Sequence, residues 1–343
     1  MAEIRRMPAE WEPHERTLIQ WPVRESLVHP ENAEEVCAGY AAAARAVLEF
    51  EPVTVIASEE TARQAARLCG SRAEIFIASH SDAWVRDSGP TVVRTEDGKR
   101  LGVRWRFNAW GGKYTPCEPD HEAAGAVLEH LNIPRADAPI VLEGGSIHTD
   151  GQGTLMTTEQ CLLNPNRNPE LGRAGIEKML RKSLGVNRFI WLKSGLAGDE
   201  TDGHVDNVAC FARPGTVLLQ TCGDPSDENY KVTVENLAVL RDAAERVPEV
   251  IEIPQPPARF YKGTRLTLSY LNFYLVNGGL ILPVFGGDAA ETDRAAGEIL
   301  QQAFPGRKIR TVDGIPLVRE GGNVHCITQQ IPAAGRSGKE KEG

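Results

Sequence analysis

Apolar residues recur along the chain at two spacings, and their alternation predicts a repeated unit of helix and strand. Helical spacing predicts helices over residues 32–50, 59–68, 120–131, 174–184, 229–245 and 289–304. Short β-branched or alternating runs predict strands over residues 17–21, 53–57, 73–78, 91–94, 101–107, 140–142, 154–158, 188–192, 204–211, 217–220, 250–253, 269–276, 280–284 and 308–311. Turn signals such as Asp97-Gly98 join several of these strands into hairpins.

The unit of helix, strand, glycine-rich loop and hairpin recurs about five times, at intervals of roughly 60 residues and without a linker. Such a unit needs neighbours to cover its small sheet, so the pattern predicts an α/β fold closed into a ring of blades, in a single domain over residues 1–334. A doubly wound α/β sheet is the alternative, but no G-x-G-x-x-G motif follows the first strand. Glycine, serine and charge fill residues 335–343, which predicts a disordered tail.

Composition and charge narrow the classes of function. Hydrophobic residues at 41% and charged residues at 25% are typical of a globular protein, and no apolar run is long enough to span a bilayer. The seven cysteines form no Cys-x-x-Cys pair and no secretory signal precedes them, so we expect a reducing cytoplasm. A net charge of −9 disfavours nucleic acid and membrane lipid as partners and does not repel a small cationic substrate; homo-oligomerisation is left open.

Ionisable residues are presented in one recurring way, at a predicted strand end close to glycine. The positions are Asp87, Glu143, the pair His204 and Asp206, and Cys326 after Gly321-Gly322. In a closed ring the equivalent strand ends converge on the central axis, so these side chains are expected to meet.

Taken singly, each of these residues has an ordinary interpretation. Cys326 fits a small buried hydrophobe, and Asp87 fits an ion pair with Arg86. On a strand, the spacing of His204 and Asp206 puts both side chains on one face, as in many structural pairs. Only as a set do they have complementary chemical roles.

The set favours nucleophilic catalysis on a cation. A cysteine attacks as the thiolate, and a histidine serves as its proton shuttle. Several buried carboxylates are costly without a cation, and no motif places a Lys or Arg among them. The substrate is therefore expected to supply the cation. A planar guanidinium that Asp87 and Asp206 hold by bidentate pairing would expose its carbon to Cys326 and lower the pKa of the thiol.

Six stretches of the chain resemble one family. They are Trp-Val-Arg-Asp-Ser-Gly-Pro (84–90), Phe-Asn-Ala-Trp-Gly-Gly (107–112), Leu-Glu-Gly-Gly-Ser-Ile-His (142–148), Leu-Leu-Asn-Pro-Asn-Arg-Asn-Pro (162–169), Gly-His-Val-Asp-Asn (203–207) and Gly-Gly-Asn-Val-His-Cys-Ile-Thr-Gln-Gln-Ile-Pro (321–332). From about residue 7 to residue 332 the chain is similar to agmatine deiminases, of the guanidine-modifying pentein superfamily. The resemblance implies a five-bladed α/β propeller, no cofactor, and hydrolysis of agmatine to N-carbamoylputrescine and ammonia.

The resemblance also implies a role for each residue. Cys326 forms a covalent amidino-thioether, His204 protonates the departing ammonia and then activates water, and Glu143 holds His204. Asp87 and Asp206 grip the guanidinium. Glu200 matches a position that contacts agmatine, and Trp84 walls the pocket or belongs to the core.

One departure from the family leaves alternatives open. Many agmatine deiminases carry a longer loop with a Tyr-x-x-Trp stretch, which is shortened here to residues 111–118. An arginine or peptidyl-arginine deiminase, with Arg86 or Arg265 at the pocket mouth, is therefore an alternative on the same fold. A cysteine amidase, which should lack the Asp87 and Asp206 pair, and a metal-binding or ligand-binding protein using His204, Asp206 and Cys326 are the others.

Overall fold

The computed structural model describes residues 4–335, and the predicted tail from residue 336 onward lies outside the described residues. Within residues 4–335 the strands form five sheets of three or four strands and one two-stranded ribbon. The first three sheets in chain order contain β1 (Ile4–Arg6), β5 (Thr91–Thr95), β6 (Arg100–Arg106) and β7 (Arg135–Val141); β8 (Ile147–Thr149), β9 (Thr154–Thr158) and β10 (Arg188–Leu192); and β11 (Ala209–Arg213), β12 (Thr216–Thr221) and β13 (Glu249–Pro254). The other two contain β16 (Tyr274–Val276), β17 (Gly279–Val284) and β18 (Lys308–Asp313); and β19 (Thr328–Pro332), β2 (His14–Gln20), β3 (Val53–Ala57) and β4 (Glu74–Ile77).

The same connection is repeated in all five sheets. Two strands pair antiparallel, and a third pairs parallel with the second after a helix crosses over, as in β5, β6 and β7. The crossover helices are α5 (Glu118–His130), α7 (Arg173–Leu184), α8 (Glu228–Asp242), α9 (Ala290–Ala303) and α1 (Ala33–Val47), and α2 (Ala62–Cys69) adds β4 to the last sheet. The predicted recurring unit is confirmed, and a single doubly wound sheet is wrong.

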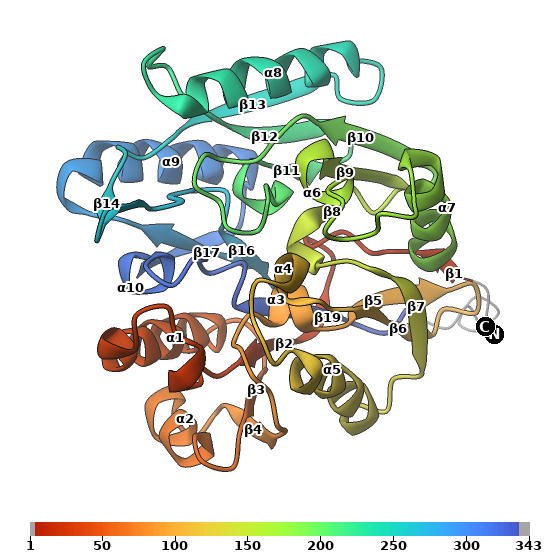
Figure 1. Cartoon of the computed structure of the whole chain (residues 1–343), viewed down its shortest axis with the longest axis vertical. Helices are drawn as coiled ribbons and strands as arrows, with labels where there is room; N and C mark the ends of the chain where they lie inside the picture. Colours follow the sequence, from red (N-terminus) through yellow and green to blue (C-terminus); the bar gives the residue numbers. More distant parts are fainter. Residues whose placement is uncertain (1–3, 336–343) are drawn as a thin grey trace.

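The two ends of the chain complete one sheet together. β19, near the C-terminus, pairs antiparallel with β2, near the N-terminus, and Thr328 lies opposite Ile19. Figure 1 shows the crossover helices at the rim and the short helices α3 (Val85–Ser88) and α4 (Ala109–Gly112) near the middle. Because Cys326 lies two residues before β19, this pairing helps to position the candidate nucleophile.

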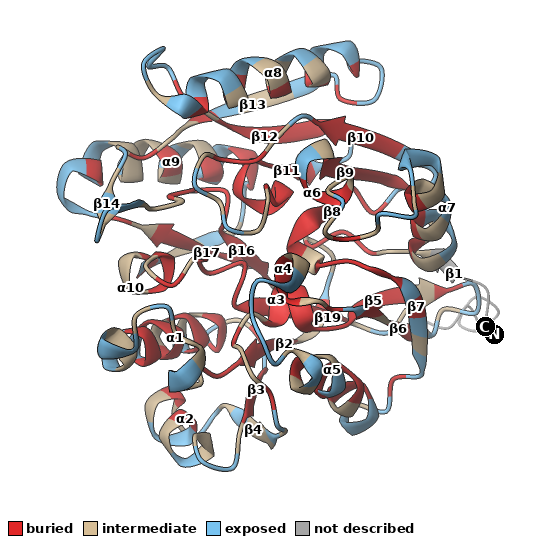
Figure 2. Ribbon diagram, in the orientation of Figure 1, coloured by how far each residue is buried: buried red, intermediate tan, exposed pale blue. Residues whose placement is uncertain are grey.

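The core lies between the sheets and one face of each crossover helix. In α1 the buried residues Val36, Tyr40, Ala43, Ala44 and Val47 recur at helical spacing and pack on the sheet of β2 and β3. Figure 2 shows inner strands such as β2 and β3 largely buried, the outer strand β4 more exposed, and the helices exposed on their outer side. Burial of each large side chain stabilises the fold by about 1.5–3 kcal/mol. No helix within residues 4–335 is both long enough and apolar enough to cross a membrane.

Two predicted strands begin later than expected. The strand predicted from residue 204 begins at Ala209, after the 3-10 helix η4 (Val205–Asn207), and the strand predicted from residue 269 begins at Tyr274. Polar side chains hold the earlier segments out of the sheet: Ser269 donates to the Asn207 carbonyl, and Asn272 Nδ2 donates to Asn207 Oδ1 at 2.9 Å. The prediction that His204 and Asp206 share one face of a strand is therefore wrong.

The remaining elements are short. The sequence did not predict them individually, and several carry site residues. They are η1 (Arg24–Ser26), η2 (Pro30–Asn32), η3 (Gly144–Ser146), α6 (Glu159–Leu162), β14 (Phe260–Tyr261), β15 (Thr264–Arg265), η5 (Gly287–Ala289) and α10 (Ile315–Val318).

Candidate active site

Five ionisable residues expected to meet do lie in one buried cluster. Asp87, Glu143, His204, Asp206 and Cys326 are each at most 6% exposed. Asp87 lies in α3, Glu143 directly before η3, His204 and Asp206 at the start of η4, and Cys326 in the turn before β19. The expectation that all of them lie at strand ends is therefore wrong for Asp87, His204 and Asp206.

Gly145 marks the point where the cluster is tightest. A Cβ atom at this position would lie 2.6 Å from His204 Nδ1, 2.8 Å from Asp87 Oδ1 and 3.0 Å from Asp206 Oδ2. The backbone of residue 145 is therefore packed directly against the charged groups, and its N–H donates to Asp87 Oδ1 at 2.9 Å. Only glycine fits here without displacing them.

The Cys326 thiol lies between an amide and a carboxylate. Asn272 Nδ2 lies 3.2 Å from Sγ, and Asp206 Oδ2 lies 3.7 Å from it. Burial, followed by the charges of Asp206 and Asp87, raises the pKa of Cys326 well above its ordinary value. Without a bound cation the thiol is protonated.

The glycine pair before Cys326 combines an unusual backbone conformation with a close contact. Gly321 has a φ of +108°, a region that favours glycine. Gly322 allows close approach, because an added Cβ would lie 2.5 Å from the Trp84 ring and 3.1 Å from Cys326 Sγ. The pair thus places the thiol beside the indole.

Asp87 is fixed by two donors. Its Oδ2 accepts from Trp110 Nε1 at 2.8 Å, and its Oδ1 accepts from the Gly145 N–H. Burial, with the neighbouring Asp206 and Glu143, raises the pKa of Asp87. The ordinary interpretation, an ion pair with Arg86, is wrong, because Arg86 donates instead to the His325 carbonyl and to Gln330.

His204 lies between two carboxylates. Its Nδ1 is 3.7 Å from Asp87 Oδ1, and its Nε2 is 3.6 Å from Glu143 Oε2. Burial acts to lower the pKa of His204, but these acceptors raise it well above its ordinary value. The ring is therefore an imidazolium. The predicted contact between Glu143 and His204 is present.

Glu143 also has a partner that the sequence did not reveal. Arg167, with a fully buried side chain, donates from Nε to Glu143 Oε1 at 2.8 Å and from Nη1 to Asp202 Oδ2 at 2.5 Å. The expectation that no Arg or Lys lies among the carboxylates is wrong. Burial acts to raise the pKa of Glu143, but His204 and Arg167 together hold it below its ordinary value.

Asp206 is hydrogen-bonded to His325. Nδ1 of His325 lies 2.9 Å from Asp206 Oδ2, and Nε2 lies 2.9 Å from Glu10 Oε2. Burial and Arg86 lower the pKa of His325, but the carboxylates of Glu10 and Asp206 raise it overall. Burial acts to raise the pKa of Asp206, but His325 holds it below its ordinary value. Asp206 Oδ1 is buried with no partner among the described residues, so it is free for a ligand.

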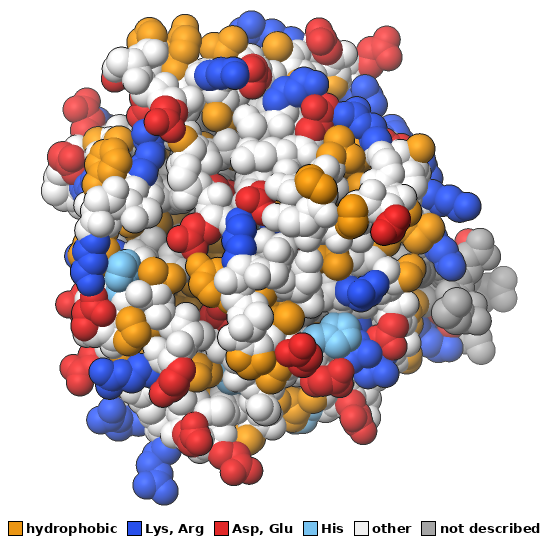
Figure 3. All heavy atoms as spheres, viewed as in Figure 1, with side chains coloured by type: hydrophobic (Ala, Val, Ile, Leu, Met, Phe, Trp, Pro, Cys, Tyr) orange, Lys and Arg blue, Asp and Glu red, His pale blue; other side chains and the backbone are white. Residues whose placement is uncertain are grey.

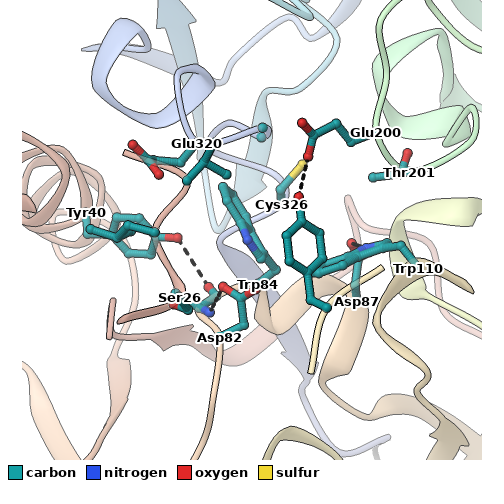
Figure 4. Close-up of a pocket in the computed structure, with 16 residues that line it drawn as sticks. Ser26, Tyr40, Asp82, Trp84, Asp87, Trp110, Glu200, Thr201, Glu320 and Cys326 are labelled. Atoms are coloured by element: carbon teal, nitrogen blue, oxygen red, sulfur yellow. Dashed lines mark hydrogen bonds between the residues drawn. The ribbon is translucent and has the colours of Figure 1, made fainter. Parts of the chain in front are cut away.

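Cys326 and Asp87 line a cavity that is open to solvent. Four carboxylates line it, from Asp82, Asp87, Glu200 and Glu320, and its lining includes no Lys, Arg or His from residues 4–335. Trp84 lines the cavity as predicted, and in Figure 4 it stands between Cys326 and the group around Tyr40. Figure 3 shows a hollow near the middle of this face, bordered by acidic side chains and one basic side chain.

The shortened loop of residues 111–118 reaches the cavity mouth. Tyr114 lines the cavity and donates from Oη to Glu200 Oε2 at 2.8 Å, and Lys113 donates to the Glu200 carbonyl and to Asp202 Oδ1. The Tyr114 ring packs edge-on against Trp110. Glu200 therefore faces the cavity as predicted, but it is exposed and already hydrogen-bonded.

Neither arginine considered for the pocket mouth lines the cavity. Arg86 points away from it, toward Gln330. Arg265 is paired with Asp227 at 2.8 Å and lines a neighbouring hollow.

The described residues contain one group that places three metal-ligating side chains together, Glu143, Cys161 and His204, with ligand atoms within 4.8 Å. It differs from the set of His204, Asp206 and Cys326 considered for a metal. Two features oppose a cation there: Glu143 already accepts from the Arg167 guanidinium, and His204 is an imidazolium.

Sequence reasoning missed Arg167, Asn272, Trp110 and Tyr114 as site residues, and it quoted His325 only as part of a motif. A signal existed for Arg167, Trp110 and His325, which lie inside the quoted motifs. Nothing in the pattern around Asn272 distinguishes it from a strand residue.

Comparison with known proteins agrees with this geometry. A family model described as Porphyromonas-type peptidyl-arginine deiminase matches residues 6–332. An agmatine deiminase of Stutzerimonas stutzeri is 46% identical over 355 residues, covering 95% of each chain. The solved structure of an Enterococcus faecalis agmatine deiminase matches with a TM-score of 0.89 at 35% identity, covering 95% of each chain. A cysteine-to-serine variant of a C. jejuni agmatine deiminase with substrate bound matches with a TM-score of 0.89 at 28% identity, covering 96% of this chain and 97% of that one.

The fold is thus that of a class of mixed α/β proteins that includes agmatine deiminases. The chain belongs to the Porphyromonas-type peptidyl-arginine deiminase family. The resemblance seen in the sequence motifs is confirmed.

Proposed function

We propose that this chain is an agmatine deiminase, which hydrolyses agmatine to N-carbamoylputrescine and ammonia through a covalent intermediate on Cys326. The supporting observation is the charge of the cavity: a buried thiol opens onto a hollow whose charged lining residues, within the described part of the chain, are all carboxylates. Such a hollow suits a substrate with a cation at each end. The relatives described above carry the same activity in their names.

The charge pattern separates agmatine from the alternatives on the same fold. Free arginine carries an α-carboxylate, which the four lining carboxylates would repel and no lining cation would bind. Peptidyl-arginine would place uncharged backbone where the lining offers carboxylates. An amidase has no need for the carboxylate pair of Asp87 and Asp206.

In the first half-reaction, Asp87 and Asp206 hold the guanidinium, and its charge lowers the pKa of the nearby thiol. The thiol proton leaves to solvent, and Cys326 Sγ attacks the guanidinium carbon. His204, an imidazolium, donates its proton to a departing nitrogen, which leaves as ammonia. The carbon remains bonded to Sγ as an amidino-thioether.

In the second half-reaction, neutral His204 takes a proton from water, whose oxygen attacks the same carbon. The carbon–sulfur bond then breaks and the carbon becomes the ureido group of N-carbamoylputrescine. The proton of the added hydroxyl passes to the departing thiolate, which restores the thiol of Cys326. Glu143, held by Arg167, stabilises the charged form of His204 in both steps. The proton transfers use side chains of this chain, water and solvent, and we propose no cofactor.

We propose further that the five repeated units close into a five-bladed propeller forming one domain over residues 1–334. Support comes from the shared ββαβ connection and from the pairing of β19 with β2, which joins the chain ends in one blade. In such a ring the residues before each inner strand face the axis.

The experiment that tests the function supplies agmatine, arginine and an arginine-containing peptide to the purified protein and measures ammonia and ureido product. Agmatine should be converted with a kcat/KM at least about 100-fold above the others, corresponding to about 2.7 kcal/mol. Parallel reactions with a chelator should proceed at the same rate. Release of no ammonia from any of the three would refute a deiminase.

A further inference from the structure

Glu320 is a buried carboxylate that the proposed chemistry does not use. It is 4% exposed, and its Oε2 accepts from the His29 N–H at 3.1 Å. Its Oε1 is buried and has no hydrogen-bond partner within residues 4–335. Glu320 also lines the cavity onto which Cys326 opens. A buried oxygen without a donor is costly, so a donor supplied by a ligand would be favoured here.

The cavity has two parts on either side of Trp84. Figure 4 shows Cys326, Asp87, Glu200 and Trp110 on one side of the indole. On the other side it shows Tyr40 and Glu320, with Ser26 and Asp82 below the indole. The second part, which we call the distal lobe, is defined by these four residues and contains no side chain assigned to the reaction.

The distal lobe contains a second carboxyl group, that of Asp82. Burial, together with Asp120 and Glu320, raises the pKa of Asp82 to about 7. Burial likewise raises the pKa of Glu320. Two carboxyl groups that resist ionisation in the absence of a cation are those that a bound cation would stabilise.

We infer that the distal lobe binds the primary ammonium of the substrate, with Glu320 Oε1 as its main acceptor and Asp82 as the second carboxylate. This inference rests on the proposed function, because it requires a substrate with a guanidinium at one end and an ammonium at the other. The four methylenes between them pack along the Trp84 indole. Six bonds separate the guanidinium carbon from the ammonium nitrogen. Three bonds of an extended protein backbone span about 3.5 Å, so six bonds of an extended substrate span about 7 Å.

Glu200 is the competing acceptor for the ammonium. It lies on the catalytic side of Trp84, is exposed, and accepts a hydrogen bond from Tyr114. An exposed carboxylate binds an ammonium in competition with water, whereas the buried Oε1 of Glu320 does not. The larger contribution is therefore assigned to Glu320.

The test compares agmatine with butylguanidine, which has the same alkyl chain and guanidinium but no ammonium. The quantity measured is the ratio of kcat/KM for agmatine to kcat/KM for butylguanidine. Wild-type protein should favour agmatine. Glu320→Gln, which keeps an acceptor for the His29 N–H, should reduce the ratio about 10-fold or more, with butylguanidine turnover nearly unchanged.

Three further variants complete the test. Asp82→Asn should lower the ratio to a smaller extent, and Glu200→Gln should lower it less than Glu320→Gln does. Glu35→Gln serves as the matched control, because Glu35 is an exposed glutamate paired with Arg319 outside the cavity, and it should leave the ratio unchanged.

The inference is overturned if Glu320→Gln slows both substrates equally, which would indicate a structural role. It is also overturned if Glu200→Gln abolishes the preference while Glu320→Gln does not, or if the wild-type protein shows no preference. Failure of the wild-type protein to hydrolyse either compound would instead refute the proposed function.

Discussion

His325 donates to one oxygen of Asp206 and leaves the other oxygen free. The Nδ1 to Oδ2 distance is 2.9 Å, and Oδ1 has no partner among the described residues. The opposite ring nitrogen is fixed 2.9 Å from Glu10, so the imidazolium cannot turn away. The relationship makes Asp206 an ionised acceptor whose free oxygen is already in place before a guanidinium arrives.

We predict that His325→Gln weakens substrate binding and shifts the pH profile. A hydrogen bond to a charged group contributes about 1.5–3 kcal/mol, so KM for agmatine should rise about 10-fold or more. Because His325 helps to lower the pKa of Asp206, its removal should move the acidic limb of kcat/KM to higher pH. A loss of activity at all pH values without movement of the limb would contradict the assigned role.

Arg167→Met should destabilise the protein by about 3–5 kcal/mol, because it leaves Glu143 buried without its cation. Thermal unfolding measures the loss. The pKa of Glu143 is held below its ordinary value of 4.5, so its contribution is present above that value and is lost as the pH falls through the lowered pKa. The difference in Tm from wild type should therefore shrink in acid, and an unchanged difference would contradict the pairing.

Gly145→Ala should reduce kcat/KM by about 100-fold or more, since the added Cβ would displace His204 and Asp87. The matched control is Gly297→Ala in α9, where an added Cβ meets nothing within 4 Å and helix propensity favours alanine. Steady-state kinetics and thermal unfolding of both variants give the comparison. An active Gly145→Ala protein would show that the charged groups are less tightly packed than described.

Asp87→Asn should make Cys326 more reactive toward iodoacetamide while abolishing turnover. The negative charge of Asp87 contributes to the raised pKa of the thiol, so its removal increases the fraction of thiolate at neutral pH. Mass spectrometry of peptides containing Cys326 follows the alkylation. Equal or slower alkylation than in the wild type would indicate that Asp87 does not act on the thiol.

The recurring unit could be predicted because it leaves a periodic pattern in the sequence. The five central residues could be predicted because each lies in a recognisable local motif. Asp87, Glu143, His204 and Cys326 each stand next to a glycine or within a motif, and the expected closed ring of repeated units predicted that they meet. The chain conformation at His204 was mispredicted because Asn207, Ser269 and Asn272 form hydrogen bonds across distant segments.

Contacts between distant segments account for the other gaps. The bond from Arg167 to Glu143 joins the loop after α6 to the end of β7, and Glu320 faces the cavity only because α10 packs beside α1. Such contacts depend on how the units pack together, which periodicity does not encode. The arrangement of polar residues around Trp84 could be known only from the structure.

The central claim is that Cys326 becomes covalently bonded to the substrate carbon. Intact-protein mass spectrometry of the enzyme, mixed with excess agmatine and quenched in acid within the first turnovers, tests it most directly. The account predicts a species heavier than the free protein by the mass of agmatine less ammonia, mapped to the peptide containing Cys326 and absent from Cys326→Ala. Turnover of agmatine by Cys326→Ala, or an adduct that maps to another residue, would contradict it.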